Sequence, residues 1–183
     1  KIALGQDHEK VAMVLNSLGW FYYHQHDLEK AESALRGAAS IVASCQTAGP
    51  KLSASIRNNL AEICRLQNNY DEAEKLAHES LQIRQSSQPI DEQEIAQSLN
   101  TLGRLYCDEG KVFPADQYFK RALAIQEKVL NPIHPDLATT LEDYAILLRK
   151  MARRNGEAKG MEARARNIRQ VLESREQGCG SRN

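Results

Sequence analysis

The sequence repeats a pattern of apolar and small residues every 42 positions, and this period restricts the possible folds more than any other feature. Each copy has a large apolar residue, then glycine or alanine, then another apolar residue three positions further on. The large residues that open the pattern are Leu18, Leu60, Leu102 and Tyr144. A register kept over four copies predicts a repeat protein, in which each unit buries its apolar surface against its neighbours.

The third copy shows what one unit contains. Leu102 and Tyr106 lie on one helical stripe, and Ala115 and Phe119 lie on a second, because both pairs have the four-residue spacing of an α-helix. Gly110 separates the two runs, as expected of a helix stop. Two amphipathic helices joined by so short a turn must be antiparallel, so each copy is predicted to be a helical hairpin. The small residue of the first helix would let the two helices approach closely.

This pattern resembles the tetratricopeptide repeat (TPR) family. The residues that match the family's pattern in order and spacing are Leu102, Gly103, Tyr106, Ala115, Phe119 and Ala122. The long period and the connection that begins at Asn131 are similar to the kinesin light chain and nephrocystin-3 type of repeat. The resemblance implies an all-α fold, a right-handed α-α superhelix (TPR solenoid) of four antiparallel hairpins, in a protein that serves as an adaptor or scaffold.

We expect a single TPR domain over residues 1–175, with repeats at about 9–50, 51–90, 91–132 and 133–175. Residues 1–7 align with the end of the third repeat, which predicts that they end a truncated upstream repeat. The aromatic run at residues 20–23 favours this, because an upstream repeat would cover part of it. The polar last helix is typical of a terminal cap, and residues 176–183 are predicted to be a disordered tail.

Composition excludes several classes of protein. The 24 basic and 24 acidic residues balance, which argues against a dedicated nucleic-acid or membrane-surface protein.

The four cysteines form no Cys-x-x-Cys pair, and this usage favours a reducing, cytoplasmic location. His24 and His26 are interpreted as turn residues because no third metal ligand follows them. We expect no metal or cofactor, and the absence of nucleophile and phosphate-loop motifs predicts that the protein is not an enzyme.

One side of each first helix is not required for the core, and in the resembling family this side lines a concave groove. The residues predicted to bind a peptide there are Asn16, Trp20, Tyr23, Asn58, Arg65, Asn100, Arg104 and Arg149. The three asparagines share one repeat position, and their amides can both donate to and accept from a peptide backbone. The arginines suit carboxylates, while the two aromatic residues can anchor an apolar side chain. The predicted partner is therefore an acidic or mixed peptide segment of another protein.

Two alternatives to peptide binding follow from the same residues. The asparagines can instead form hydrogen bonds to the neighbouring repeats and only stabilise the stack. The exposed first helix or the groove can also bind a second copy of the chain, which would make this a homo-oligomerisation module without a peptide ligand.

Overall fold

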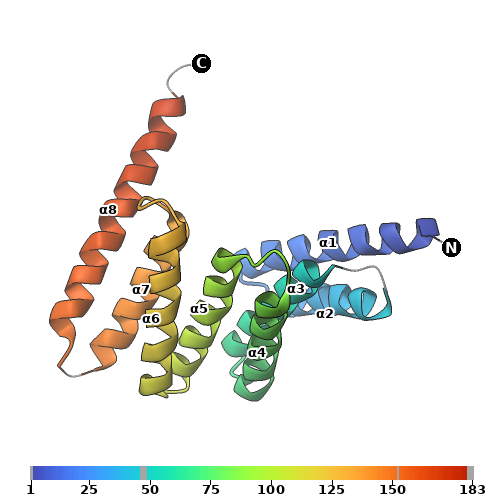
Figure 1. Ribbon diagram of the computed structural model, residues 1–183, viewed down its shortest axis with the longest axis horizontal. Coiled ribbons are helices and arrows are strands. Elements are labelled where there is room, and N and C mark those ends of the chain that lie inside the picture. The colour runs from blue at the N-terminus through green and yellow to red at the C-terminus, as the bar shows by residue number, and fades with distance from the viewer. Residues whose placement is uncertain (1, 46–48, 152, 181–183) are drawn as a thin grey trace. The chain divides into compact units, whose positions relative to one another are not determined.

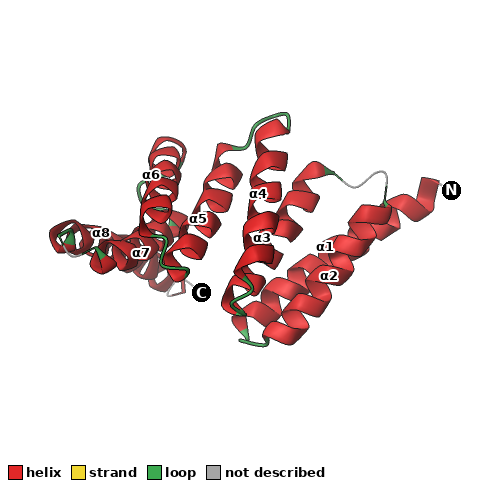
Figure 2. Ribbon diagram, turned by 90° about the horizontal axis from the view of Figure 1, so that it is seen from below, coloured by secondary structure: helices red, strands yellow, loops and turns green. Residues whose placement is uncertain are grey.

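The computed structural model describes residues 2–45, 49–151 and 153–180, and in these ranges the chain is all-α (Figure 1). The eight helices found there form four antiparallel hairpins, which confirms the predicted fold class (Figure 2). The chain divides into two compact units, unit 1 (Lys1–Asp91) and unit 2 (Glu92–Asn183), and each unit contains two hairpins.

Unit 1 contains α1 (Ile2–His24), α2 (Leu28–Ser44), α3 (Pro50–Leu66) and α4 (Tyr70–Ser86). Helix α2 packs both against α1 in its own hairpin and against α3 in the next one. The core that joins these three helices consists of Ala12, Ala31, Leu35, Ala38, Ile56, Leu60 and Ile63. The predicted sharing of a core between successive hairpins is therefore present in this unit.

Unit 2 contains α5 (Glu92–Asp108), α6 (Val112–Val129), α7 (Pro135–Lys150) and α8 (Asn155–Gly180). Here α6 contacts both α5 and α7. Between α6 and α7, the rings of Phe119 and Tyr144 stack with their centroids 5.6 Å apart. His134 caps α7, since its Nδ1 accepts a hydrogen bond from the backbone N–H of Asp136, and Pro135 takes the first helical position.

A buried polar network also joins the helices of unit 2. Asp116 on α6 accepts hydrogen bonds from the Tyr144 hydroxyl on α7 (2.7 Å), from Lys120 (2.6 Å) and from Arg154. Burial raises the pKa of Asp116, but these donors outweigh it and the net pKa is lowered. Burial and the bond to Asp116 raise the pKa of Tyr144 to about 12, so its hydroxyl keeps the proton that it donates.

The turns inside three hairpins have the same geometry at the same repeat position. His26, Asn68 and Gly110 have φ angles of 59°, 61° and 76°, which place them in the left-handed region. In each turn the following N–H donates to a carbonyl five residues earlier, as in Asn69 to Cys64 at 2.8 Å. This is the Schellman arrangement that ends many helices, and it confirms the predicted turn positions.

Glycine in the first helix allows the close approach that the sequence predicts. A Cβ added at Gly19 would lie 2.5 Å from Leu35 Cγ, and one added at Gly103 would lie 2.8 Å from the ring of Phe119. Both contacts are far shorter than van der Waals separation, and both partner side chains are fully buried. The paired helices therefore depend on the absence of a side chain at these two positions.

We expect Gly103→Ala to lower the free energy of unfolding by about 1 kcal/mol, because overpacking against Phe119 exceeds the gain in helix propensity. Gly160→Ala is the matched control in unit 2, since a Cβ there meets open space and should raise stability by about 0.5–1 kcal/mol. Urea unfolding followed by circular dichroism measures both. Equal stabilisation by the two substitutions would contradict the close-approach explanation.

Two predicted boundaries differ from the structure. Helix α1 begins at Ile2 and runs without a break, although residues 1–7 were expected to end a separate helix. The corresponding junction before α7 contains Pro132 and Pro135, whereas no proline interrupts residues 2–9, so the helix continues. Helix α8 extends to Gly180, whereas residues 176–183 were expected to form a disordered tail, and residues 181–183 lie outside the described range.

Candidate functional site

The aromatic residues near the end of α1 form an exposed stack in unit 1. The rings of Trp20 and Tyr23 lie nearly parallel, with centroids 4.7 Å apart and an interplanar angle of 11°. His24 meets Trp20 edge-on, with centroids 4.8 Å apart. Trp20 remains 43% exposed, so this stack presents a rigid aromatic surface to solvent. The structure therefore brings together the two aromatic residues that the sequence predicts as peptide anchors.

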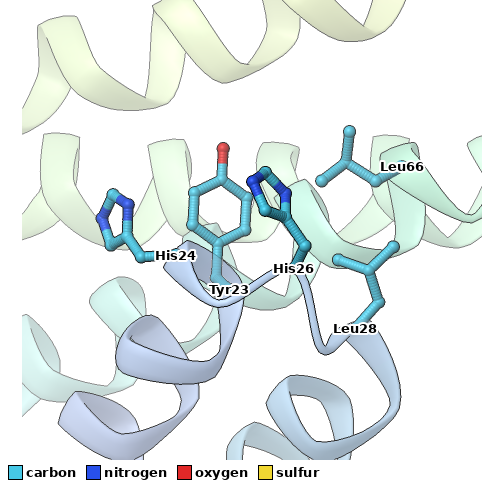
Figure 3. A pocket seen from close by; sticks show the side chains of 5 residues that line it. All are labelled: Tyr23, His24, His26, Leu28 and Leu66. Atoms are coloured by element: carbon cyan, nitrogen blue, oxygen red, sulfur yellow. The ribbon is translucent and has the colours of Figure 1, made fainter.

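A pocket of about 450 Å³ adjoins this stack (Figure 3). It is lined by Tyr23, His24, His26, Leu28 and Leu66. Tyr23 and the two histidines come from the end of α1 and its turn, whereas Leu66 comes from the end of α3. The pocket thus lies between the two hairpins of unit 1 and combines two leucines with three rings that carry polar atoms.

Sequence reasoning missed His24, His26, Leu28 and Leu66 as pocket residues, although a signal for Leu66 was present. The same repeat position holds His24, Asp108 and Lys150 in the other copies, so a leucine there is exceptional. Leu66 is 40% exposed, which shows that the core does not require it.

His26 lines the pocket from a strained backbone conformation. Glycine adopts the left-handed region without cost and asparagine tolerates it, but other residues lose about 1 kcal/mol or more there. The equivalent positions hold Asn68 and Gly110, so only His26 departs from the residues that this turn favours. The positive φ itself belongs to the turn, because Asn68 and Gly110 share it and neither of them lines the pocket.

We expect His26→Gly to raise the free energy of unfolding by about 1 kcal/mol, because it removes this strain. Asn68→Gly is the matched control at the same turn position and should give a smaller gain, since asparagine already tolerates the conformation. Urea unfolding compares the two variants. A loss of stability in His26→Gly would show that the imidazole contributes more to the fold than its backbone conformation costs.

Two of the three predicted asparagines, Asn16 in unit 1 and Asn100 in unit 2, form a hydrogen bond to the following hairpin of their unit. Asn16 on α1 accepts from Asn59 on α3 at 3.0 Å, and Asn100 on α5 donates to Thr140 on α7 at 2.6 Å. These bonds correspond to the alternative in which the amides stabilise the stack. They use one polar atom of each side chain.

The second polar atom of Asn100 has a different environment. The Thr140 hydroxyl donates to the Asp136 carbonyl at 3.0 Å, so it can only accept from Asn100, which fixes the amide nitrogen on that side. The Asn100 Oδ1 is then buried without a hydrogen-bond partner, and the same holds for the Oδ1 of Asn58. An unsatisfied buried carbonyl is costly unless a ligand or water completes it.

We expect Asn100→Ala to lower the free energy of unfolding by about 1 kcal/mol, because it removes the bond to Thr140. Asn58→Ala should leave stability unchanged or raise it, since its buried oxygen makes no bond in the folded chain. Thermal unfolding of the two single variants, followed by circular dichroism, compares these effects. An equal loss in both would show that Asn58 also supports the stack.

The predicted arginines are all in ion pairs within their own unit. Arg65 pairs with the buried Glu62 at 3.1 Å, and Arg104 lies 3.6 Å from Asp143. Arg149 forms a bidentate pair with Glu162 on α8, at 2.6 and 2.8 Å, and these bonds raise the pKa of the guanidinium. The positive charges expected to bind carboxylates are therefore compensated by neighbouring acids.

Cys64 and Cys107 are buried thiols. Burial raises the pKa of Cys64 to about 11 and also raises that of Cys107, so both remain thiols at neutral pH. Among the described residues, no three potential metal ligands lie close enough together to hold an ion. Within the same part of the chain, none of the helices combines the length and apolar character needed to span a bilayer.

Comparison with known proteins identifies the class to which this arrangement belongs. Profiles of the tetratricopeptide repeat match residues 11–42, 52–112 and 94–170, which together cover most of the chain. The chain therefore belongs to the tetratricopeptide repeat family. Such repeats generally mediate protein–protein interaction or scaffolding and are typically not enzymes. A comparison with curated protein sequences gave no match.

Solved structures with similar repeats support the kinesin light chain-like type. BtubC (BKLC) from P. vanneervenii is 26% identical, with a TM-score of 0.70 over 88% of this chain and 64% of its own. The chain thus spans less than two thirds of the length of BtubC. Two structures of a kinesin light chain-type protein with TPR-like repeats from Podosopora anserina share the fold at 20% identity. One has a TM-score of 0.62 over 89% of this chain and 76% of its own, and the other has 0.58 over 94% and 77%.

Proposed function

We propose that the protein is an adaptor that binds an extended peptide segment of a partner protein along the first helices of unit 1. The observation that supports this most is the exposed Trp20–Tyr23 stack beside the pocket that His26 and Leu66 help to line. An exposed aromatic pair next to a partly apolar pocket is the arrangement in which an anchoring side chain is most effectively desolvated.

The amide groups supply the second element of the proposed site. The Oδ1 of Asn58 has no hydrogen-bond partner in the described chain, and because it is buried, the amide must rotate toward the peptide before this oxygen accepts a backbone N–H. A backbone contact of this kind binds a segment whatever its side chains. The Oδ1 of Asn100 in unit 2 is likewise buried without a hydrogen-bond partner.

The ion pairs of the predicted arginines change the kind of partner segment that we propose. Arg65, Arg104 and Arg149 are each paired with an acid, so a strongly acidic segment would have to break these pairs before it could bind. A mixed segment with one aromatic or aliphatic anchor fits the surface better. The anchor would enter the pocket and contact Tyr23, Leu28 and Leu66.

Trp20 is the only tryptophan in the chain, so its fluorescence reports on this site directly. We expect an unstructured, tryptophan-free peptide of about ten residues with a central phenylalanine to change the Trp20 emission on binding. The same peptide with a central alanine should bind at least about tenfold more weakly, which corresponds to 1.4 kcal/mol. Fluorescence titration measures both affinities.

Tyr23→Ala should weaken the binding of the phenylalanine peptide by a similar factor, because it removes one wall of the pocket. Phe113→Ala is the matched control, since Phe113 is the most exposed of the large apolar residues whose side chains the structure describes, and it lies on α6 in unit 2. The proposal is wrong if the central residue of the peptide has no effect, or if Phe113→Ala weakens binding as much as Tyr23→Ala does.

A further inference from the structure

Two of the five residues that line the pocket of unit 1 are histidines (Figure 3). His24 ends α1, His26 lies in the turn that follows, and both are exposed to solvent in the open pocket. His24 contacts the rings of Trp20 and Tyr23 edge-on. Within the described part of the chain, no hydrogen bond or ion pair engages the side chain of either histidine. Solvent is therefore left to hydrate the ring nitrogens.

The fold does not require a histidine at either position. The residues at the equivalent positions of the second and third repeats are Leu66 and Asn68, and Asp108 and Gly110. All three turns nevertheless have a positive φ angle at the second of these positions. The pair of imidazoles is thus particular to the first repeat, which also carries the exposed aromatic stack beside the pocket.

The two imidazoles give the wall of the pocket a charge that depends on pH. The ionisable side chains that line it are Tyr23, His24 and His26. Histidine is the residue that ordinarily changes charge between pH 5 and 8. Mild acid therefore adds positive charge to a pocket whose other lining residues include Leu28 and Leu66.

The charged groups on the helices around the pocket do not line it. At the start of α2, Asp27 and Lys30 form an ion pair of 2.7 Å, and at the end of α3, Glu62 and Arg65 form one of 3.1 Å. The other charged side chains near the starts of α2 and α4 are Glu29, Glu32, Arg36, Asp71 and Glu72. Since none of these acids is on the wall of the pocket, none is placed there to compensate a protonated histidine.

We propose that His24 and His26 make peptide binding depend on pH, because the pocket accepts an apolar anchor only while both imidazoles are neutral. This inference rests on the proposed function, since it concerns the anchor of the same peptide.

The direction of the effect follows from hydration. An apolar side chain that contacts Leu28 and Leu66 removes water from the imidazoles beside them. A neutral ring loses little, whereas an imidazolium loses the hydration of its charge and gains no carboxylate in return. Binding is therefore coupled to the release of protons. The affinity is highest where histidine is neutral and decreases as the pH falls through the range in which histidine takes up a proton.

A titration over pH tests the proposal. The phenylalanine peptide is made with blocked ends and without histidine or acidic residues, so that its own charge stays constant. Fluorescence anisotropy of the labelled peptide gives its affinity at constant ionic strength. We expect the affinity to fall about tenfold between about pH 7.5 and 5.5 for each histidine that must be neutral. Calorimetry in two buffers with different ionisation enthalpies should show that binding releases protons at about pH 6.

Variants assign the released protons to the pocket. The double variant His24→Gln and His26→Asn should bind with one affinity throughout this pH range and release no protons. Asparagine is chosen because Asn68 occupies the equivalent turn position. Each single variant should remove part of the proton release, which gives a second measurement if the double variant does not fold. His78→Gln is the matched control, since His78 lies on α4 outside the pocket and its side chain is 45% exposed, and it should keep the full pH dependence.

The possible outcomes separate this inference from the proposed function. A peptide that binds at no pH would refute the proposed function and this inference with it. Where the peptide does bind, three results overturn the inference alone. These are an affinity that does not change with pH, tighter binding in acid, and a pH dependence that the double variant retains. Circular dichroism at both ends of the pH range checks that the chain remains folded.

Discussion

The close contact between the two helices of each hairpin is the interaction on which the rest of the structure depends. Where Gly19 and Gly103 lack a side chain, Leu35 and Phe119 fill the space from the opposite helix. Once the helices are this close, α2 and α6 can each use another side to cover the next first helix. The 42-residue period of the sequence therefore results from one packing arrangement that is repeated along the chain.

The same arrangement decides which surfaces remain available for function. Helix α1 buries Ala12 and Gly19 in its hairpin, and it leaves two other sides exposed. One side carries the exposed apolar residues Val11, Val14, Leu18 and Phe21, and the other carries the stack that Trp20 and Tyr23 form beside the pocket. No other first helix described in the chain has so much apolar surface exposed, because its counterparts at these positions are largely buried or polar. We therefore place the proposed peptide site on the first repeat.

Much of the fold could be predicted from the sequence, because packing in a repeat protein follows a period that one chain displays several times. The hairpins, the turns at His26, Asn68 and Gly110, and the role of Gly103 all follow from spacing and residue size. The ends of α1 and α8 could not be predicted, since they depend on whether a helix continues where no proline or core contact stops it.

The candidate site was less predictable, because it depends on which side chains meet across helices. Spacing placed Arg149 on the side of the helix assigned to the groove, but the structure pairs it with Glu162 of the following helix. Spacing also aligned the asparagines, yet it gave no indication that Asn100 would donate to Thr140 and leave its oxygen unsatisfied. The pocket joins residues of α1, its turn and α3, and no single-helix pattern reveals such a combination.

The most direct test of the central claim, that unit 1 binds an anchoring side chain in this pocket, is an NMR measurement of intermolecular NOEs. The chain would be observed in complex with the peptide that carries a central phenylalanine. The account predicts NOEs from the phenylalanine ring to the methyl groups of Leu28 and Leu66. NOEs that reach only the methyl groups of Val11 and Val14, on the other exposed side of α1, would contradict it.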